Sequence, residues 1–502
     1  MASKVPLGAI AGVVGFLAMV EVTSGILQGY YTPLLTDIAR LLGIEDGRVN
    51  LFEGVQLMVS ALVVPALAKL GDMFGHRRIL LVSTAVTAIA SVAVAFAPSF
   101  PLFTIAWALQ GFYVVWLPLE VALIFSRSRH LENGAALTRK AAGILVAALE
   151  VGAIVGALAG GAILDTVLPN AADYSGVELQ QYLAGGMWIV LIVPAICVIG
   201  CFFVILFGVK ESPDLTGGRL DYWGLVLVST ALLVFTAGLF LLRDLGLGHW
   251  LPWSAIVLGI LLFIPFVRYE LKQDDPLIDI RMFAQKSAWP VFVTAGLFGI
   301  AVLGAQAPLS TFARTDPDLH GYGLGLRGFS VSLLIGFYVL SLAVGALLFP
   351  LVTRVLAPRR ALMGAAILVG LGYLALIPFH DTFIQMVSCM IVAGIGSGAL
   401  VAALPAAAAA VAPVGQTGVA TGLTNTTKTI GGAVASCAFA LALINHAAPA
   451  GSAASEVGPL SGYITVWIVC GVGALLAAAL LAVVPKEAFR DAREIEVVAE
   501  VR

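Results

Sequence analysis

Apolar residues run along this chain in long stretches, and polar residues are confined to short breaks between them. Each stretch is about 20 residues or longer, which is enough for an α-helix to cross ~30 Å of hydrocarbon. The breaks contain turn residues or charge, as in "FAPSFP", "VKESPDLTGGRLD" and "KQDDPLIDIR". The pattern predicts fourteen membrane-spanning helices over residues 7–31, 51–70, 79–97, 101–126, 138–164, 185–208, 220–243, 251–271, 288–313, 328–350, 359–379, 383–411, 417–445 and 461–484.

Composition supports an all-α polytopic membrane protein. Charged residues make up 11% of the 502 residues, and the mean hydropathy is +1.02, whereas soluble domains carry about 25% charged residues. The net charge of −2 indicates no partner, because the charges are segregated into loops.

Lys and Arg fall mostly on one side of the predicted membrane. If the N-terminus is cytoplasmic, 21 of the 27 Lys and Arg residues lie in cytoplasmic segments and five lie outside. Positive charge in short loops favours the cytoplasmic side. We therefore expect a multi-pass cell-membrane protein with both termini in the cytoplasm. Many Ala, Gly and Val with few Lys favour a bacterial source.

One predicted cytoplasmic turn, "AKLGDMFGHRR" at residues 68–78, carries a cluster of charge. A degenerate copy follows later, because "GDMFGHRRIL" (71–80) aligns with "TRVLAPRRAL" (353–362). Paired turns of this kind indicate duplicated helical bundles, as in many transporters.

This turn resembles the signature G-x-x-x-D-R-x-G-R-R/K that joins helices 2 and 3 in the major facilitator superfamily. Met73 stands in place of its first arginine. The residues that match are Asp72, Gly75, Arg77 and Arg78.

The fifth predicted span, "EVGAIVGALAGGAILD", resembles the motif G-x-x-x-G-P-x-x-G-G of the fourteen-helix drug:proton antiporter branch of that superfamily. Ala157 stands at the proline of the motif. The matching glycines are Gly152, Gly156, Gly160 and Gly161.

Two further spans carry the resemblance. "WALQGFYVVWLP" resembles the helix 4 motif R-x-x-Q-G, with Gln110 retained and Trp107 at the arginine often implicated in proton coupling. "MVEVTSG" is similar to the L-D-x-T pattern of helix 1, with Glu21 in place of the aspartate and Thr23 retained.

The resemblance covers nearly the whole chain and implies a domain organisation. Two six-helix bundles are expected at residues 1–208 and 288–484. A linker with two additional transmembrane helices is expected at 209–287, and a cytoplasmic tail at 485–502.

The resemblance also implies secondary active export of hydrophobic, cationic small molecules. Protons would be exchanged by alternating access as the bundles rock. No cofactor is expected beyond the proton gradient, no nucleic acid is expected as a partner, and the protein is expected to function as a monomer.

The turn at 68–78 is interpreted as a conformational gate formed by Asp72, Gly75, Arg77 and Arg78. Asp72 falls at a helix C-terminus, where the helix dipole disfavours an acid, so it should seek a cation or another helix N-terminus. Gly75 permits the tight backbone. The alternative is that Arg77 and Arg78 only anchor helix ends.

The glycines of span 5 are interpreted as a helix-interface motif. Residues 152, 156 and 160 share one helix face and allow a second helix to approach closely. Ordinary packing without functional consequence is the alternative.

Four carboxylates lie inside predicted spans: Glu21, Glu53, Glu120 and Glu150. Such groups are costly in hydrocarbon and mark ion or substrate pathways. Glu21, Glu120 and Glu150 are therefore candidates for proton coupling. Structural alternatives are a water interface for Glu53, an arginine of the 127–140 turn for Glu120, and a contact within its own bundle for Glu150. Glu21 has no cation near it in sequence.

A substrate cavity is predicted from spans 2 and 4. An aromatic pair and a carboxylate at i, i+3 and i+7 share a face of span 4 and suit a lipophilic cation. Simple packing of the aromatic residues is the alternative. The candidate cavity residues are Glu53, Gln56, Gln110, Tyr113, Trp116 and Glu120.

Lys428 is the one lysine inside a predicted span. Its side chain could snorkel to the membrane surface, or it could neutralise a carboxylate in one conformation.

The energy source and the competing functions follow from motifs. No G-x-x-x-x-G-K-[ST] occurs, so transport must use an ion gradient, and the carboxylates favour protons over sodium. A dedicated exporter or flippase for a native lipid or secondary metabolite stays open. A membrane enzyme is disfavoured, because H-E-x-x-H and G-x-S-x-G are absent. No metal-ligand pattern surrounds the cysteines.

Overall fold

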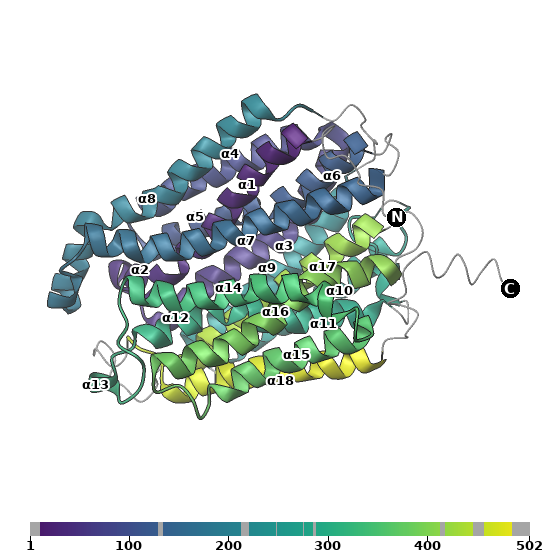
Figure 1. Ribbon diagram of the computed structural model, residues 1–502. Coiled ribbons are helices and arrows are strands. Elements are labelled where there is room, and N and C mark those ends of the chain that lie inside the picture. The colour runs from purple at the N-terminus through teal and green to yellow at the C-terminus, as the bar shows by residue number, and fades with distance from the viewer. Residues whose placement is uncertain are drawn as a thin grey trace.

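The computed structural model describes residues 11–128, 134–211, 220–246, 248–274, 276–284, 288–411, 417–444 and 456–483. Within these ranges every regular element is a helix, as the sequence predicts. The helices run side by side in two groups, coloured purple to blue and green to yellow in Figure 1. The predicted tail at 485–502 lies outside the described residues.

The first group contains the elements up to residue 208. It packs around one apolar core that includes Leu17, Trp116 and Met187. Its helices are α1 (Ala11–Tyr30), α2 (Leu35–Leu42), α3 (Asp46–Phe74), α4 (His76–Ala95), α5 (Phe100–Gln110), α6 (Trp116–Ser128), α7 (Gly134–Val167) and α8 (Gly176–Gly208).

The second group has its own apolar core, which includes Phe298, Tyr373 and Trp467. We call the two groups the first half and the second half. The helices of the second half are α11 (Trp289–Gly299), α12 (Gln306–Arg314), α13 (Pro317–His320), α14 (Phe329–Val352), α15 (Pro358–Ala375), α16 (Phe383–Val411), α17 (Thr417–Ala442) and α18 (Leu460–Val483).

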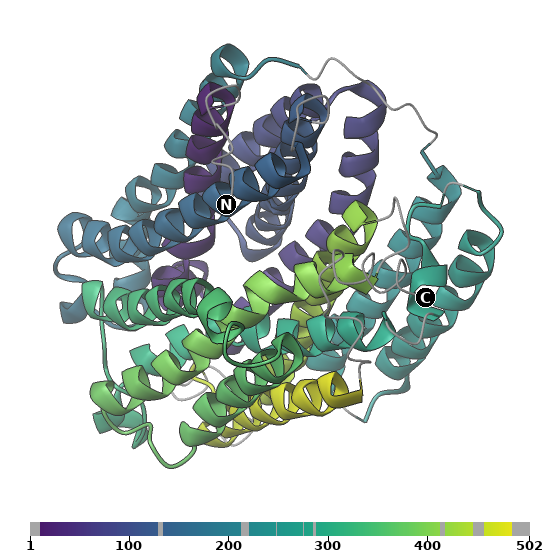
Figure 2. The ribbon, with the colours of Figure 1, turned by 45° about the vertical axis from the view of Figure 1, so that its right-hand side comes forward.

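Two helices lie between the halves in the chain, α9 (Tyr222–Leu245) and α10 (Trp250–Glu270). They pack on each other, and a small apolar cluster joins them to both halves. In that cluster Val228 and Phe266 meet Met58 of α3 and Ala433 of α17. Figure 2 shows this pair at one side of the molecule, in teal.

Two spans are interrupted within their length. The 3-10 segment Gly111–Val115 separates α5 from α6, and the π-helical segment Ile300–Gly304 separates α11 from α12. A side chain at residue 111 has no room, because its Cβ would lie 2.6 Å from Ser60 Oγ. Irregular turns of this kind inside helices are frequent at functional sites.

Twelve helical stretches of the described residues are long and apolar enough to cross a membrane. The predicted number of fourteen crossings is therefore not confirmed. Apart from the four-residue α13, the described helices that fall outside this set are α15, whose first turn contains Arg359 and Arg360, and α17, which contains Lys428. α15 packs within the second half, whereas α17 packs both on helices of that half and on α3 of the first half.

The two ends of the helix bundle are named here by a residue at each. The Gly75 end holds the turn between α3 and α4, and the Asp37 end holds α2 and the last turn of α12. In Figure 1 the Asp37 end is on the left.

Candidate functional site

Glu21 of α1 and Glu120 of α6 face each other inside the first half. Both residues are 0% exposed, and their carboxyl groups lie within hydrogen-bonding reach of each other. As two carboxylates they offer only acceptors, and none of their four oxygens has a donor among the described residues. One proton placed between them would turn an unfavourable contact into a hydrogen bond.

The surroundings of this carboxyl pair are apolar or weakly polar. The Cys201 thiol of α8 lies beside both acids and near the Thr23 hydroxyl. That hydroxyl donates to the main-chain oxygen of Met19, 3.1 Å away. Sequence reasoning selected both acids separately, but their spacing along the chain gave no signal that they meet.

An arginine partner for Glu120 is not seen in the described part of the 127–140 turn. Arg127 donates to the main-chain oxygens of Lys210 and Glu211. Arg129 lies outside the described residues, and the side chain of Arg139 is not described.

Glu53 and Gln56 lie half-buried on one face of α3. The Tyr113 ring lies close enough to Glu53 and Glu21 for both charges to act on its hydroxyl. Trp116 is fully buried and packs edge-on against Tyr113, with ring centroids 6.1 Å apart. Trp116 therefore supports Tyr113 from inside the first half.

Gln110 lies in the interior of the first half. It is 1% exposed, and its side-chain nitrogen donates to the Tyr31 hydroxyl at 3.1 Å and to the Ser91 hydroxyl at 3.0 Å. Trp107, at the arginine position of the resembled motif, packs among Tyr31 and Phe52 with centroid distances of 4.8 and 5.0 Å. An aromatic cluster therefore fills the place of a cation.

Glu150 lies at the boundary between the halves. Its charge acts on Lys428 of α17 and on Tyr338 of α14, both of which belong to the second half. Lys428 is half-buried, and the choice between snorkelling and neutralising a carboxylate stays a prediction.

The glycines of α7 serve two different contacts. A Cβ at Gly152 would lie 2.1 Å from the Val22 oxygen, and one at Gly160 would lie 2.3 Å from the Tyr30 oxygen, both in α1. Gly156 faces Ile26 in the same helix. Gly161 instead meets the second half, where its main-chain nitrogen donates to the Ser332 hydroxyl at 3.0 Å.

The turn at 68–78 is closed by residues of the first half. Asp72 pairs with His76 at 3.1 Å. Glu211, just after α8, accepts from the main-chain nitrogens of Arg77 and Arg78 at 3.0 and 3.1 Å. An acid is favourable at this N-terminus of α4. Glu211 was not identified from the sequence, and its place directly after an apolar span is the signal that could have found it.

Gly75 has a positive φ of 110°, and a Cβ there would lie 2.6 Å from the Glu211 carboxylate. The glycine therefore makes both the turn and the cap possible. The role of the turn as a gate stays a prediction.

Polar contacts join the halves at the Asp37 end. Arg314 pairs with Asp37, and the Ser310 hydroxyl donates to the Thr32 oxygen at 2.6 Å. Asp165 accepts from the main-chain nitrogen of Phe329 at 2.9 Å. This end is therefore closed in the structure. The partners in these contacts come from segments far apart in the chain, so their pairing could not be predicted from the sequence.

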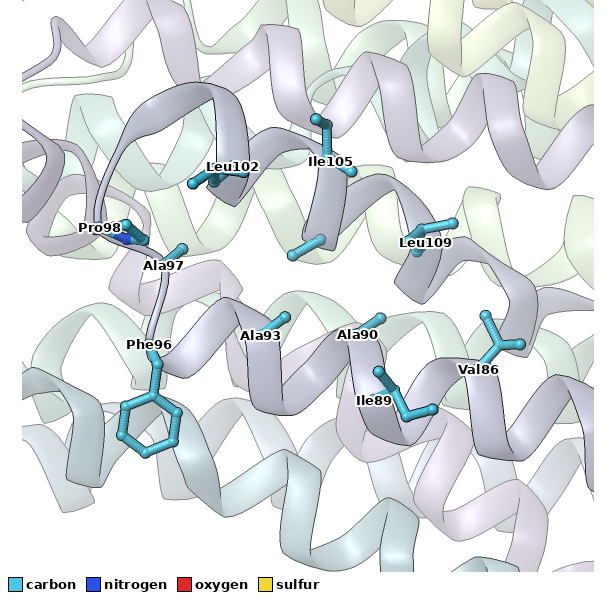
Figure 3. A pocket seen from close by; sticks show the side chains of 11 residues that line it. Val86, Ile89, Ala90, Ala93, Phe96, Ala97, Pro98, Leu102, Ile105 and Leu109 are labelled. Atoms are coloured by element: carbon cyan, nitrogen blue, oxygen red, sulfur yellow. The ribbon is translucent and has the colours of Figure 1, made fainter.

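A separate apolar groove of about 490 Å³ lies between α4 and α5. Figure 3 shows its walls, to which Ile89, Leu102 and Ile105 contribute exposed side chains. None of the candidate acids lines it. Such a face suits lipid acyl chains in a membrane.

Comparison with known proteins places the chain in a family. The profile of the Major Facilitator Superfamily matches residues 17–436. The chain belongs to this superfamily and is a multi-pass membrane transporter, not an enzyme.

Several relatives are drug efflux or resistance proteins. A puromycin resistance protein of Streptomyces alboniger is 29% identical over 470 residues, covering 89% of this chain and 86% of that protein. The multidrug efflux pump LfrA of Mycolicibacterium smegmatis is 26% identical over 390 residues, covering 75% and 71%.

Solved structures of transporters share the fold. An auto-inhibited peptide transporter of the POT family superposes with a TM-score of 0.63 at 14% identity, covering 93% of this chain and 96% of that chain. The recognition of the superfamily from sequence motifs is confirmed by the profile match over residues 17–436.

Proposed function

We propose that this transporter exports hydrophobic, cationic small molecules in exchange for protons. In this proposal the protein works as a monomer in the bacterial cell membrane, with both termini in the cytoplasm. The names of the relatives, a puromycin resistance protein and a multidrug efflux pump, support small-molecule export.

The main support for proton coupling is the contact between Glu21 and Glu120. Two ionised carboxylates that are buried in contact, with no donor among the described residues, repel each other and lose hydration on burial. A single proton relieves both penalties. The pair therefore suits the task of holding one proton in one conformation and releasing it in another.

The substrate chemistry is inferred from two half-buried side chains of α3 and from the buried Tyr113, which lies close to Glu21. Glu53 and Gln56 present an acid and an amide, and Tyr113 adds an aromatic ring. Cations are attracted to carboxylates and to the faces of aromatic rings. Glu150, with Lys428 opposite, supplies a second acid at the boundary between the halves.

In the proposed cycle the Asp37 end and the Gly75 end are closed in turn. The Asp37 end is closed in the structure, and the bias of Lys and Arg along the chain supports a position outside the cell for that end. When that end opens, a proton from outside reaches the carboxyl pair and lowers its affinity for a cation, which leaves. When the Gly75 end opens, the proton is released to the cytoplasm and the next cation binds.

Transport in proteoliposomes tests the proposal. Vesicles loaded with a pH-sensitive dye receive a panel of lipophilic cations, and proton movement is recorded for the wild type, Glu21→Gln and Glu120→Gln. Substrate-driven proton movement is expected in the wild type, and its loss is expected in both variants, because each glutamine removes a proton-accepting oxygen.

The matched control is Glu178→Gln, which removes an exposed acid from the same half. It should leave proton movement unchanged. Absence of any proton signal in the wild type with every cation would contradict the proposal and favour a dedicated exporter of a native lipid or metabolite. Full coupling in Glu21→Gln and Glu120→Gln would move the role to Glu150.

A further inference from the structure

Arg243, in the last turn of α9, contacts both halves of the transporter at once. Its Nη1 donates to the main-chain oxygen of Ala440 in α17, and its Nη2 donates to the carboxylate of Glu45, the residue before α3. The Arg243 side chain is 3% exposed. A single buried guanidinium therefore joins the inserted helix, the first half and the second half.

The backbone around this contact is closely packed. A Cβ at Gly47 would lie 3.2 Å from Arg243 Nη1 and 3.0 Å from the main-chain oxygen of Leu443. The first turn of α3 therefore approaches the end of α17 with the guanidinium beside it. The neighbouring pair Arg48–Asp244 is looser, at 3.6 Å, and its side chains are 37% and 57% exposed.

We propose that Arg243 is a positioning residue of the transport cycle, and that through it the inserted helix α9 forms part of the gate at the Asp37 end. This inference rests on the alternating access of the proposed function. The other contacts that close the Asp37 end join the two halves directly, as Arg314–Asp37 does. Arg243 adds a bridge from a third element.

Opening of the Asp37 end must separate Glu45 from Ala440, because they belong to different halves. The guanidinium can then follow only one of them. Glu45 carries the opposite charge, and a buried arginine without its acid is strongly destabilising. Arg243 therefore keeps Glu45 and releases the Ala440 oxygen, so that α9 moves with the first half.

Distance measurement between spin labels tests this inference without any substrate. Labels are placed at Val177→Cys in α8 and Leu319→Cys in α13, which are 69% and 77% exposed and lie at the Asp37 end in opposite halves. The parent without these two cysteines shows whether any of the native cysteines is labelled.

We expect Arg243→Gln to raise the ratio of the long-distance to the short-distance population by about tenfold or more, since a charge-assisted hydrogen bond is lost from the closed state only. Arg243→Lys keeps the charge but not the forked geometry. It should restore part of the closed population.

Arg48→Gln is the matched control, because it removes a neighbouring arginine from an exposed pair. It should leave the distribution as in the wild type. If Arg243→Gln does not fold, Arg243→Lys takes its place, because it keeps the charge beside Glu45 and loses the second arm of the fork that reaches the Ala440 oxygen; a smaller rise of the long-distance population than in Arg243→Gln is expected, and a distribution equal to that of Arg48→Gln would overturn the inference.

A distribution in folded Arg243→Gln that matches Arg48→Gln would overturn the inference. The inference would also be overturned if Arg243→Gln and Arg48→Gln changed the distance distribution by equal amounts. The measurement involves no proton and no substrate, so it can be interpreted even if the transporter is not coupled to protons. A single fixed distance in every variant would reject alternating access itself.

Discussion

Alanine in place of Gly152 should destabilise the transporter, whereas alanine in place of Gly143 in the same helix should not. Both are glycines of α7. A Cβ at residue 152 would lie 2.1 Å from the Val22 oxygen and 2.8 Å from its carbon, whereas one at residue 143 meets nothing within 4 Å. The two substitutions are chemically identical and differ only in what the new methyl group meets.

The magnitude follows from the geometry. A Cβ rarely approaches an oxygen more closely than 3.0 Å, so α1 and α7 must separate by about 1 Å, and overpacking of this kind costs about 1–3 kcal/mol. Alanine also gains about 1 kcal/mol of helix propensity over glycine. This gain is common to both variants, so Gly152→Ala should be less stable than Gly143→Ala by about 1–3 kcal/mol.

Thermal unfolding of the purified protein in one detergent measures this difference. Gly143→Ala should unfold at or above the wild-type temperature, and Gly152→Ala below it. Equal unfolding temperatures for the two variants would refute the reasoning, because the close contact between α1 and α7 would then carry no stability.

Three further predictions concern other contacts. Arg314→Gln should cost about 3–5 kcal/mol of stability, since it removes the ion-pair partner of buried Asp37, and adding Asp37→Asn should recover much of the loss. Thermal unfolding of the two single variants and the double variant tests this, and purely additive effects would contradict it. Gly75→Ala should cost at least about 1–2 kcal/mol, because φ is 110° and the methyl group meets Glu211, and unchanged thermal stability would argue against this. Trp107→Arg should cost at least about 3 kcal/mol and lower the yield of folded protein without improving proton coupling, because it buries a guanidinium in an aromatic cluster; a well-folded variant with stronger coupling would contradict the assigned packing role.

Much of the fold was predictable from the sequence because the membrane imposes a simple rule. Long apolar stretches must be helices, since no water is present to satisfy the backbone. The rule is weaker where polar residues enter a helix. α17 contains Lys428, and the first turn of α15 contains two arginines. The predicted number of fourteen crossings is therefore not confirmed.

The candidate acids could be selected from the sequence, but their partners could not. Glu21 and Glu120 are conspicuous because acids are rare in apolar spans, whereas their contact depends on the packing of α1 against α6. Glycine spacing predicted a close helix contact, and in the structure the neighbours of Gly152, Gly156 and Gly160 belong to α1. Trp116 and Gln110 share helix faces with cavity candidates, yet the 3-10 segment at 111–115 and the interior hydrogen bonds place them inside the first half.

Proton release on substrate binding tests the central claim most directly. The purified protein in weakly buffered detergent solution is mixed with a lipophilic cation, and released protons are counted with a pH dye against bound cation. A shared proton on the carboxyl pair predicts release of about one proton per cation, and no release from Glu21→Gln or Glu120→Gln. Binding of the cation to the wild type without any proton release would contradict proton-coupled export through Glu21 and Glu120.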